Sequence, residues 1–192
     1  FRIYRNDPSN LNSLSDNHVV AIVPDSNNGF WVGTQSAGLS HYNPINDNFQ
    51  RFQAGGKIGD LADNGISALK LDAKKLLWVA TNSGNLQWFN EKQKTFQKVP
   101  TVNFNEVGRV KSIKDFRQGL LLGTRNGIFF LANNTAALQA WPARSPLTTE
   151  IETITQSLDG KEIWVATLEQ GLFHYSAEGE LIKHFKRSDG LA

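Results

Sequence analysis

The apolar residues of this chain fall in short alternating runs and not at helical spacing. Two of the clearest are the β-branched run at 19–23 and the run at 66–71, followed by the polar stretches Asp25-Ser26-Asn27-Asn28-Gly29 and Asp72-Ala73-Lys74-Lys75. Alternation of this kind over four to eight residues is typical of half-buried strands that end in turns. No pattern of helical period continues beyond about two turns. The chain is therefore expected to be built from short strands without long helices.

One four-residue stretch, Trp31-Val32-Gly33-Thr34, recurs along the chain. The other copies are Trp78-Val79-Ala80-Thr81, Leu121-Leu122-Gly123-Thr124 and Trp164-Val165-Ala166-Thr167. The steps between them are 47, 43 and 43 residues. A period in the forties indicates a repeat architecture.

Each copy shares further features that predict four strands. An alternating run precedes the four-residue stretch, and two short runs with apolar ends follow it. A glycine comes three or four residues after each Thr: Gly38, Gly84, Gly127 and Gly171. These glycines are expected to supply positive φ in a hairpin between the second and third strands. The Gly or Ala in the third position of the stretch would let a bulky side chain of a neighbouring sheet approach closely.

A four-stranded meander of this length cannot bury both its faces alone, but copies stacked around an axis can, which predicts a β-propeller. The period is too long for a leucine-rich solenoid, and the Trp-Asp signature of WD40 repeats is absent. Closed propellers have four to eight blades. We therefore predict an all-β fold, with four four-stranded blades forming a partial, open arc of a larger, seven-bladed propeller.

The repeat boundaries follow from the same pattern. Both ends of the chain fall inside it, so we expect an excised piece of a larger protein. The predicted segments are 1–4, the last strand of a preceding blade; 14–53, 61–100, 109–142 and 145–186, the four blades; and 188–192, the start of a further repeat.

Composition excludes several classes of protein. A net charge of +2 is too small to favour nucleic acid as a partner. No apolar run approaches the roughly 18 residues of a membrane span, so no membrane contact is expected. Cysteine is absent, which removes disulfides, thiolate metal sites and cysteine nucleophiles.

The sequence contains no complete signature of catalysis, metal binding or cofactor binding. The segment 25–29 resembles the start of a calcium loop, but Ser36 stands where the loop needs Glu. The Gly-rich segment 54–60 is not a phosphate loop, because Ile58 follows Lys57. Neither His-Glu-x-x-His nor Gly-x-Ser-x-Gly occurs. We therefore predict no catalytic residue, no metal and no cofactor in this chain.

Several residues allow a second interpretation. His41 and His174 share one repeat position, which favours a structural role over catalysis. Trp31, Trp78 and Trp164 could bind sugar rings, but their repeat position favours packing between blades. Carboxylates from different blades could converge for glycoside cleavage; the candidates, for which turn or surface roles are favoured, are Asp72, Asp115, Asp159 and Glu169.

The copies resemble the repeats of the two-component regulator propeller family. That pattern combines a Leu-Ser-x-Asn-x-Val start, a Trp-Val/Ile-Gly-Thr strand, a Gly-Leu pair and a Phe-x-x-Tyr/Phe ending. Copy 1 carries nearly all of it, in Leu14-Ser15-Asp16-Asn17-His18-Val19, residues 31–34, Gly38-Leu39, Tyr42, Phe49 and Phe52. Copy 2 has Leu61-Ala62-Asp63-Asn64 and residues 78–81, and copy 4 has residues 164–167 and Gly171-Leu172. Copy 3 departs most, with Leu121 in place of Trp and no Leu-Ser-x-Asn start.

The resemblance implies a ligand-sensing region in the periplasm, at the N-terminal end of a membrane receptor. Such receptors continue into a histidine kinase or a diguanylate cyclase, so the fragment itself is expected not to be an enzyme. The implied partners are a small molecule or an oligosaccharide and a second copy, through open propeller edges or a receptor dimer. A protein-interaction scaffold and a polysaccharide hydrolase or lyase are the alternatives.

In a propeller, the loops that join second to third strands meet the loops between blades at one mouth of the channel. Residues there vary while the framework repeats, as expected when loops on a rigid scaffold carry recognition. The predicted ligand-binding residues are Gln35, Asn82, Arg125, Asn126, Glu169, Gln170, His18 and Asn64.

Overall fold

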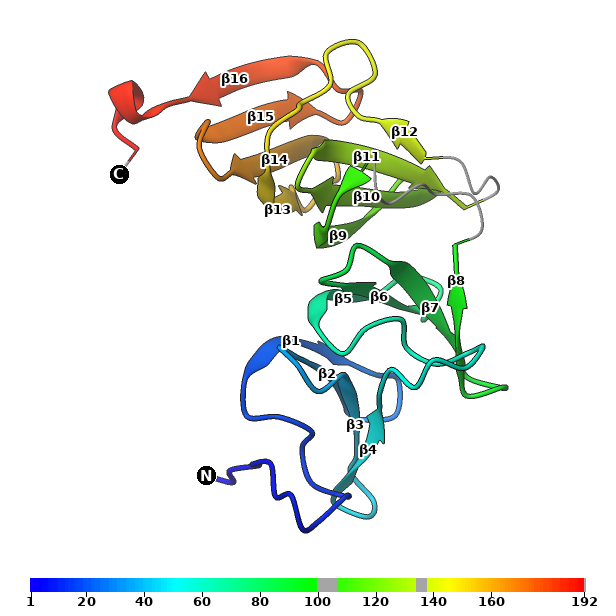
Figure 1. Cartoon of the computed structure of the whole chain (residues 1–192). Coiled ribbons are helices and arrows are strands. Elements are labelled where there is room, and N and C mark those ends of the chain that lie inside the picture. The colour runs from blue at the N-terminus through cyan, green and yellow to red at the C-terminus, as the bar shows by residue number, and fades with distance from the viewer. Residues whose placement is uncertain (100–106, 134–137, 192) are drawn as a thin grey trace. The chain divides into compact units, whose positions relative to one another are not determined.

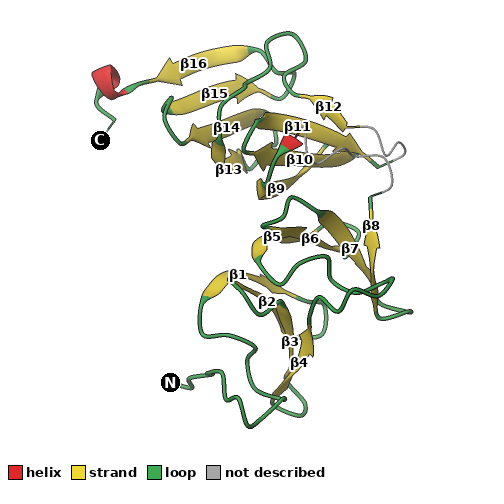
Figure 2. Ribbon diagram, in the orientation of Figure 1, coloured by secondary structure: helices red, strands yellow, loops and turns green. Residues whose placement is uncertain are grey.

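The computed structural model describes residues 1–99, 107–133 and 138–191. The chain divides into two compact units, 1–99 and 100–192. Each unit contains two four-stranded antiparallel sheets, in which strands follow one another in chain order (Figures 1 and 2). Across the described residues, the prediction of an all-β chain made of four four-stranded blades is confirmed.

The first unit holds blades 1 and 2. Blade 1 consists of β1 (Val19–Pro24), β2 (Phe30–Thr34), β3 (Leu39–Asn43) and β4 (Asn48–Phe52). Blade 2 consists of β5 (Ile66–Leu71), β6 (Leu77–Thr81), β7 (Leu86–Asn90) and β8 (Thr95–Lys98).

The second unit holds blades 3 and 4. Blade 3 consists of β9 (Val110–Phe116), β10 (Gly119–Thr124), β11 (Gly127–Ala132) and β12 (Leu138–Ala140). Blade 4 consists of β13 (Ile151–Gln156), β14 (Glu162–Thr167), β15 (Leu172–Ser176) and β16 (Leu181–Phe185), and a 3-10 turn, η1 (Arg187–Asp189), follows it.

The hairpin glycines adopt the predicted backbone conformation. The φ angles of Gly38, Gly84, Gly127 and Gly171 are 78°, 84°, 124° and 82°. A Cβ on Gly38 would lie 2.2 Å from the carbonyl oxygen of Phe52 on β4. Only glycine satisfies both the positive φ and the close approach of β4.

The small residue at the end of the second strand receives the next blade, as predicted. A Cβ on Gly33 would lie 2.7 Å from Cγ2 of Ile66, the first residue of blade 2. In the second unit, a Cβ on Gly123 would lie 2.8 Å from Cγ2 of Ile151, the first residue of blade 4. Both bulky residues pair with the Thr that ends the second strand of their own blade.

The apolar core of each unit lies between its two blades. In the first unit, Trp31 of β2 packs edge-on against Phe89 of β7 with ring centroids 5.0 Å apart. The buried residues of this core are Trp31, Leu39, Leu61, Ile66, Leu77, Val79, Phe89 and Phe96. In the second unit they are Phe116, Leu121, Ile128, Trp141, Ile151, Ile154, Ile163, Val165, Phe173 and Tyr175.

In the described part of the chain, residues 1–4 and 188–191 lie outside the sixteen strands. Residues 1–4 have no strand partner, but Tyr4 packs on blade 1, where its hydroxyl donates to Asp47 Oδ1 at 2.8 Å. That they form the last strand of a preceding blade stays a prediction, as does the assignment of 188–192 to a further repeat. The repeat pattern also predicts a connection between two blades at residues 101–108, of which 101–106 lie outside the described residues.

Candidate functional site

At one end of every blade, the turn after the second strand is tied to the segment that enters the first strand. The backbone N–H just after the Thr donates to the carbonyl just before the first strand. The pairs are Gln35 to His18 at 3.0 Å, Asn82 to Gly65 at 2.7 Å, Arg125 to Arg109 at 3.0 Å and Leu168 to Glu150 at 2.9 Å. We call these paired segments the end loops. They hold seven of the predicted ligand-binding residues at turn or entry positions, and Asn64 lies next to Gly65.

In the first unit, an aspartate locks each end loop. Asp16 accepts from the backbone N–H of His18 at 3.0 Å and from Ser36 Oγ at 2.9 Å. Both bonds contribute to holding the pKa of Asp16 below its ordinary value; the bond from His18 is the largest cause. Asp63 accepts in the same way from the N–H groups of Gly65 and Ser83, at 3.1 and 3.0 Å.

These two aspartates were not among the predicted site residues. Each occupies the third position of the Leu-x-Asp-Asn segment that begins a repeat. That shared position was a signal that could have identified them. They fix the backbone of the end loops, from which the side chains of Gln35 and His18 are exposed to solvent.

Asn64 differs from the other predicted residues because its side chain is engaged in the framework. Its Oδ1 accepts from the N–H of Ala54 at 2.7 Å, and its carbonyl accepts from the N–H of Gly38 at 2.8 Å. These bonds join the start of blade 2 to a hairpin of blade 1 and to the segment that leaves blade 1. The Asn64 side chain therefore serves the contact between blades, whereas Asn82, half-buried, lies at the turn beside it.

In the second unit, the end loops are charged. Lys111 Nζ lies 2.6 Å from Glu150 Oε1 and 2.5 Å from Glu152 Oε1. Burial lowers the pKa of Lys111, but the hydrogen bonds to both carboxylates outweigh it and the pKa is raised overall. The pKa of Glu150 is lowered, mainly by Lys111 and further by the positive charge of Arg125. Arg125 and Asn126 are exposed beside this ion-pair group.

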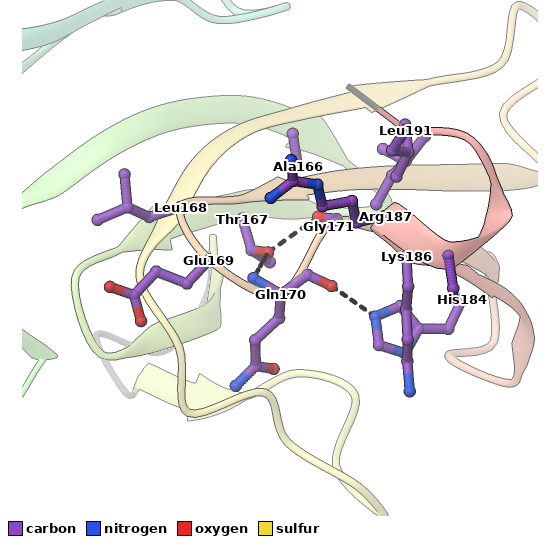
Figure 3. A pocket seen from close by; sticks show the side chains of 12 residues that line it. Ala166, Thr167, Leu168, Glu169, Gln170, Gly171, His184, Lys186, Arg187 and Leu191 are labelled. Atoms are coloured by element: carbon purple, nitrogen blue, oxygen red, sulfur yellow. Dashed lines mark hydrogen bonds between the residues drawn. The ribbon is translucent and has the colours of Figure 1, made fainter.

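Glu169 and Gln170 form the exposed turn of blade 4, at the rim of a pocket of about 860 Å³. Figure 3 shows Thr167 donating to the carbonyl of Gly171, at 2.8 Å, and His184 Nε2 beside the carbonyl of Gln170, at 2.6 Å. The turn backbone is thus fixed, while the Glu169 and Gln170 side chains are exposed. His184, Lys186 and Arg187, which also line this pocket, were not predicted.

Apolar residues line this pocket together with the polar ones. Ala166, Leu172 and Leu191 line it, on the face of blade 4 that corresponds to the face of blade 1 covered by blade 2. In blade 1 the same position is filled by Leu61 and Ile66, both 2% exposed. The apolar part of this pocket therefore corresponds to the face on which the next blade packs in the first unit.

The repeated histidines lie against the repeated tryptophans. His41 stacks on Trp31 with centroids 4.2 Å apart, and His174 stacks on Trp164 at 3.9 Å. His41 Nε2 lies 2.6 Å from Asp25 Oδ2. Burial raises the pKa of Asp25, but hydrogen bonds from His41 and from two backbone N–H groups outweigh it, so this pKa lies below its ordinary value. This arrangement supports a structural role for His41.

The candidate acids Asp72 and Asp159 are engaged in turns. Asp72 accepts from two backbone N–H groups of its own turn and from Trp78 Nε1 at 2.9 Å. Asp159 accepts from Ser157 Oγ at 2.7 Å. Among the described residues, no three histidine or acidic side chains gather around a possible metal position, and no helix has the length and apolar character of a membrane span.

Comparison with known proteins identifies the repeat. Residues 13–36 match the family model described as "Two component regulator propeller". They include Leu14-Ser15-Asp16-Asn17 and the 31–34 stretch, so the predicted resemblance is confirmed there. No curated protein matches the sequence.

The solved structures that are similar share the fold. The extracellular domain assigned to a hybrid two component system, BT3049 of B. thetaiotaomicron, superposes with a TM-score of 0.77 at 19% identity, over 93% of this chain and 25% of that one. The extracellular domain assigned to a one component system, BT4673 of the same organism, gives 0.65 at 24% identity, over 83% and 21%. The computationally designed Ika8 protein gives 0.63 at 12% identity, over 87% and 48%.

This chain thus spans about a quarter of the length of the natural extracellular domains that it matches. At these identities the likeness concerns the fold. Together, the four blades, the matched repeat and the superpositions show that the chain is a β-propeller segment whose first blade carries a two component regulator propeller repeat.

Proposed function

We propose that this chain is the ligand-sensing part of an extracytoplasmic propeller, in a membrane receptor whose output module is a kinase or a diguanylate cyclase. The receptor segment would lie in the periplasm. The observation that supports this most is the repeated end-loop geometry: one backbone hydrogen bond recurs in all four blades, whereas the side chains it presents differ.

The chemistry of those side chains favours a polyhydroxylated ligand. The end loops present amides, an imidazole, a guanidinium and a carboxylate, which donate to and accept from hydroxyl groups. Exposed members are His18, Gln35, Arg125, Asn126, Glu169 and Gln170. An oligosaccharide would exchange hydrogen bonds with the exposed members of one unit. In the first unit, Asp16 and Asp63 fix the framework beneath them.

A test is thermal unfolding of the purified chain with a panel of oligosaccharides. A ligand present at a hundredfold excess over its Kd stabilises the folded state by roughly 2.7 kcal/mol, which corresponds to a rise in Tm of about 5–11 °C. The paired substitution Arg125→Ala/Asn126→Ala should remove the shift caused by a sugar that contacts blade 3, and Gln35→Ala the shift caused by one that contacts blade 1.

The matched control is Lys74→Ala, an exposed substitution in the turn at the other end of blade 2, which should keep the full shift. Equal loss in the control and the end-loop variants would count against binding at the end loops. Turnover of a polysaccharide by the purified chain would contradict a non-enzymatic sensor.

A further inference from the structure

We propose that the second unit binds a neutral sugar residue in a pocket of about 520 Å³, which lies between the turn from β15 to β16 and the connection that precedes blade 4. Figure 1 shows this connection, in yellow, beside the turn. The turn lies at the opposite end of β15 from the end-loop turn of blade 4. The site therefore goes beyond the function proposed above and does not depend on a ligand at the end loops.

The evidence begins with a tyrosine position that two blades share. Tyr42 and Tyr175 are each the fourth residue of the third strand of their blade. In blade 1, the Tyr42 hydroxyl donates to Asp47 Oδ1 at 2.8 Å. Gly179 takes the place of Asp47 in blade 4, because each lies two residues before the residue that pairs with the tyrosine, and each has a positive φ, 89° and 51°. Blade 4 thus has no side chain at the position that accepts from the tyrosine in blade 1.

The hydroxyl of Tyr175 has no hydrogen-bond partner among the described residues. Tyr175 is nevertheless only 3% exposed, lines the pocket and packs edge-on against Trp141 with ring centroids 5.4 Å apart. Burial raises the pKa of this phenol, so the hydroxyl keeps its proton and acts as a donor. A buried polar group without a partner costs free energy. A ligand that places an acceptor in the pocket would remove that cost.

The pocket lies where a longer connection fills the space in the first unit. The connection before blade 4 has ten residues, 141–150, whereas the connection before blade 2 has thirteen, 53–65. The longer one follows the fourth strand of its blade, where Gly59 O accepts from the N–H of Phe96 at 2.7 Å. Phe96 is 4% exposed, whereas Leu181, which takes its place in blade 4, is 53% exposed. Both walls of the pocket belong to the second unit, so the space is a property of this pair of blades.

The lining of the pocket favours a neutral ligand that carries hydroxyl groups. Its apolar surface includes Pro142, on which the C–H groups of a sugar ring can pack. Arg144 Nη1 lies 3.6 Å from Glu180 Oε1, so its charge is compensated, and Glu178 adds a second carboxylate. Two carboxylates beside one guanidinium disfavour an anion. An ammonium group offers no acceptor to the Tyr175 hydroxyl, whereas a sugar hydroxyl can accept from it and donate to a carboxylate.

The test is a titration of the whole chain with D-glucose, D-galactose, cellobiose and lactose, followed through the backbone amide resonances by NMR spectroscopy. A sugar in this pocket should shift the amide resonance of Gly179. Tyr175→Phe should weaken this binding about tenfold, because it removes the donor and keeps the ring. Tyr42→Phe is the matched control and should leave the affinity unchanged, because its hydroxyl donates to Asp47 and not to a ligand.

A second variant tests the site if Tyr175→Phe does not fold. Ala143→Trp, at an exposed residue of the pocket lining, should fill the pocket and abolish the shift at Gly179. No shift at Gly179 with any of these sugars, or equal affinities of Tyr175→Phe and the wild type, would overturn the site. Tighter binding of D-glucuronate than of D-glucose would overturn the neutral class of ligand. Shifts at Asn126 without a shift at Gly179 would overturn this site and leave binding at the end loops intact.

Discussion

The contact between blades 1 and 2 and the contact between blades 3 and 4 fill the same space with different residues. In the first, Trp31 from the second strand and Phe52 from the fourth strand pack on Phe89 at 5.0 and 5.3 Å. In the second, Leu121 replaces the tryptophan, and Trp141, in the place of Phe52, packs on Tyr175 at 5.4 Å. The buried indole thus comes from the second strand in blade 1 and from the residue after the fourth strand in blade 3, and it is buried in both contacts.

The comparison shows that the two contacts between blades fill a similar buried volume, although the residue at the repeated tryptophan position differs. A buried core tolerates exchanges that keep the total volume and penalises those that change it. Leu121 is 0% exposed and Trp141 is 7% exposed, so neither leaves a gap. The divergence of the third copy, which lacks the Trp of its repeat, is therefore compensated by a residue later in the same blade.

The largest expected effect comes from removing either indole. Trp31→Ala and Trp141→Ala should each lower the free energy of unfolding by about 3–5 kcal/mol, because each leaves a cavity between two blades. Urea unfolding followed by far-UV circular dichroism measures this. Trp164→Ala is the matched control and should cost roughly 1–2 kcal/mol, because Trp164 is half-buried on its own blade. Equal losses at all three positions would contradict packing between blades.

Placing a tryptophan at position 121 of the third copy tests directly whether Trp141 compensates for its absence there. Leu121→Trp alone should destabilise by about 1–3 kcal/mol, since Trp141 already fills the space. Combined with Trp141→Phe, the loss should shrink, with a coupling energy of roughly 1–2 kcal/mol in a double-mutant cycle. Additive losses would show that the two positions do not share one space.

The close approach at the end of the second strand can be tested with a single methyl group. Gly33→Ala places a Cβ 2.7 Å from Cγ2 of Ile66 and should cost about 1–3 kcal/mol. The same substitution in an Ile66→Ala background should cost less, because the opposing methyl is gone. Ala80→Gly, at the matching buried position of blade 2, serves as the reference for exchanging glycine and alanine at this place in a blade.

The smallest expected changes in stability concern the two histidine–carboxylate pairs, His41 with Asp25 and His174 with Glu162. Asp25→Asn should cost about 1–2 kcal/mol, because a charged hydrogen bond to His41 is lost. Glu162→Gln should stay within about 0.5 kcal/mol, because Glu162 Oε2 lies 3.3 Å from a His174 Nε2 that makes no hydrogen bond among the described residues.

The pH dependence of the free energy of unfolding in the acidic range should also depend on Asp25. Its pKa in the folded chain lies below the unfolded value of about 3.9. The contribution is therefore fully present above that unfolded value and is lost as the pH falls through the folded pKa. Asp25→Asn should make the free energy of unfolding depend less on pH in this range, as measured by urea unfolding at several pH values. An unchanged pH dependence would mean that other carboxylates cause it.

The sequence alone determined the local features. Period-2 runs define the strands, the recurring stretch defines the repeat, and Gly38 with its equivalents defines the hairpins, because strand alternation and positive φ are properties of neighbouring residues. The place for a neighbouring blade beside Gly33 was also predictable, since only a small residue permits it.

Only the tertiary structure decided which residues from separate repeats meet. It paired Gly123 with Ile151, gave Trp141 the space left by Leu121, engaged Asn64 between blades and made Asp16 and Asp63 lock the end loops. These outcomes depend on contacts between residues far apart in the chain, where volume and hydrogen-bond direction select the partners. No spacing along one strand encodes such a choice.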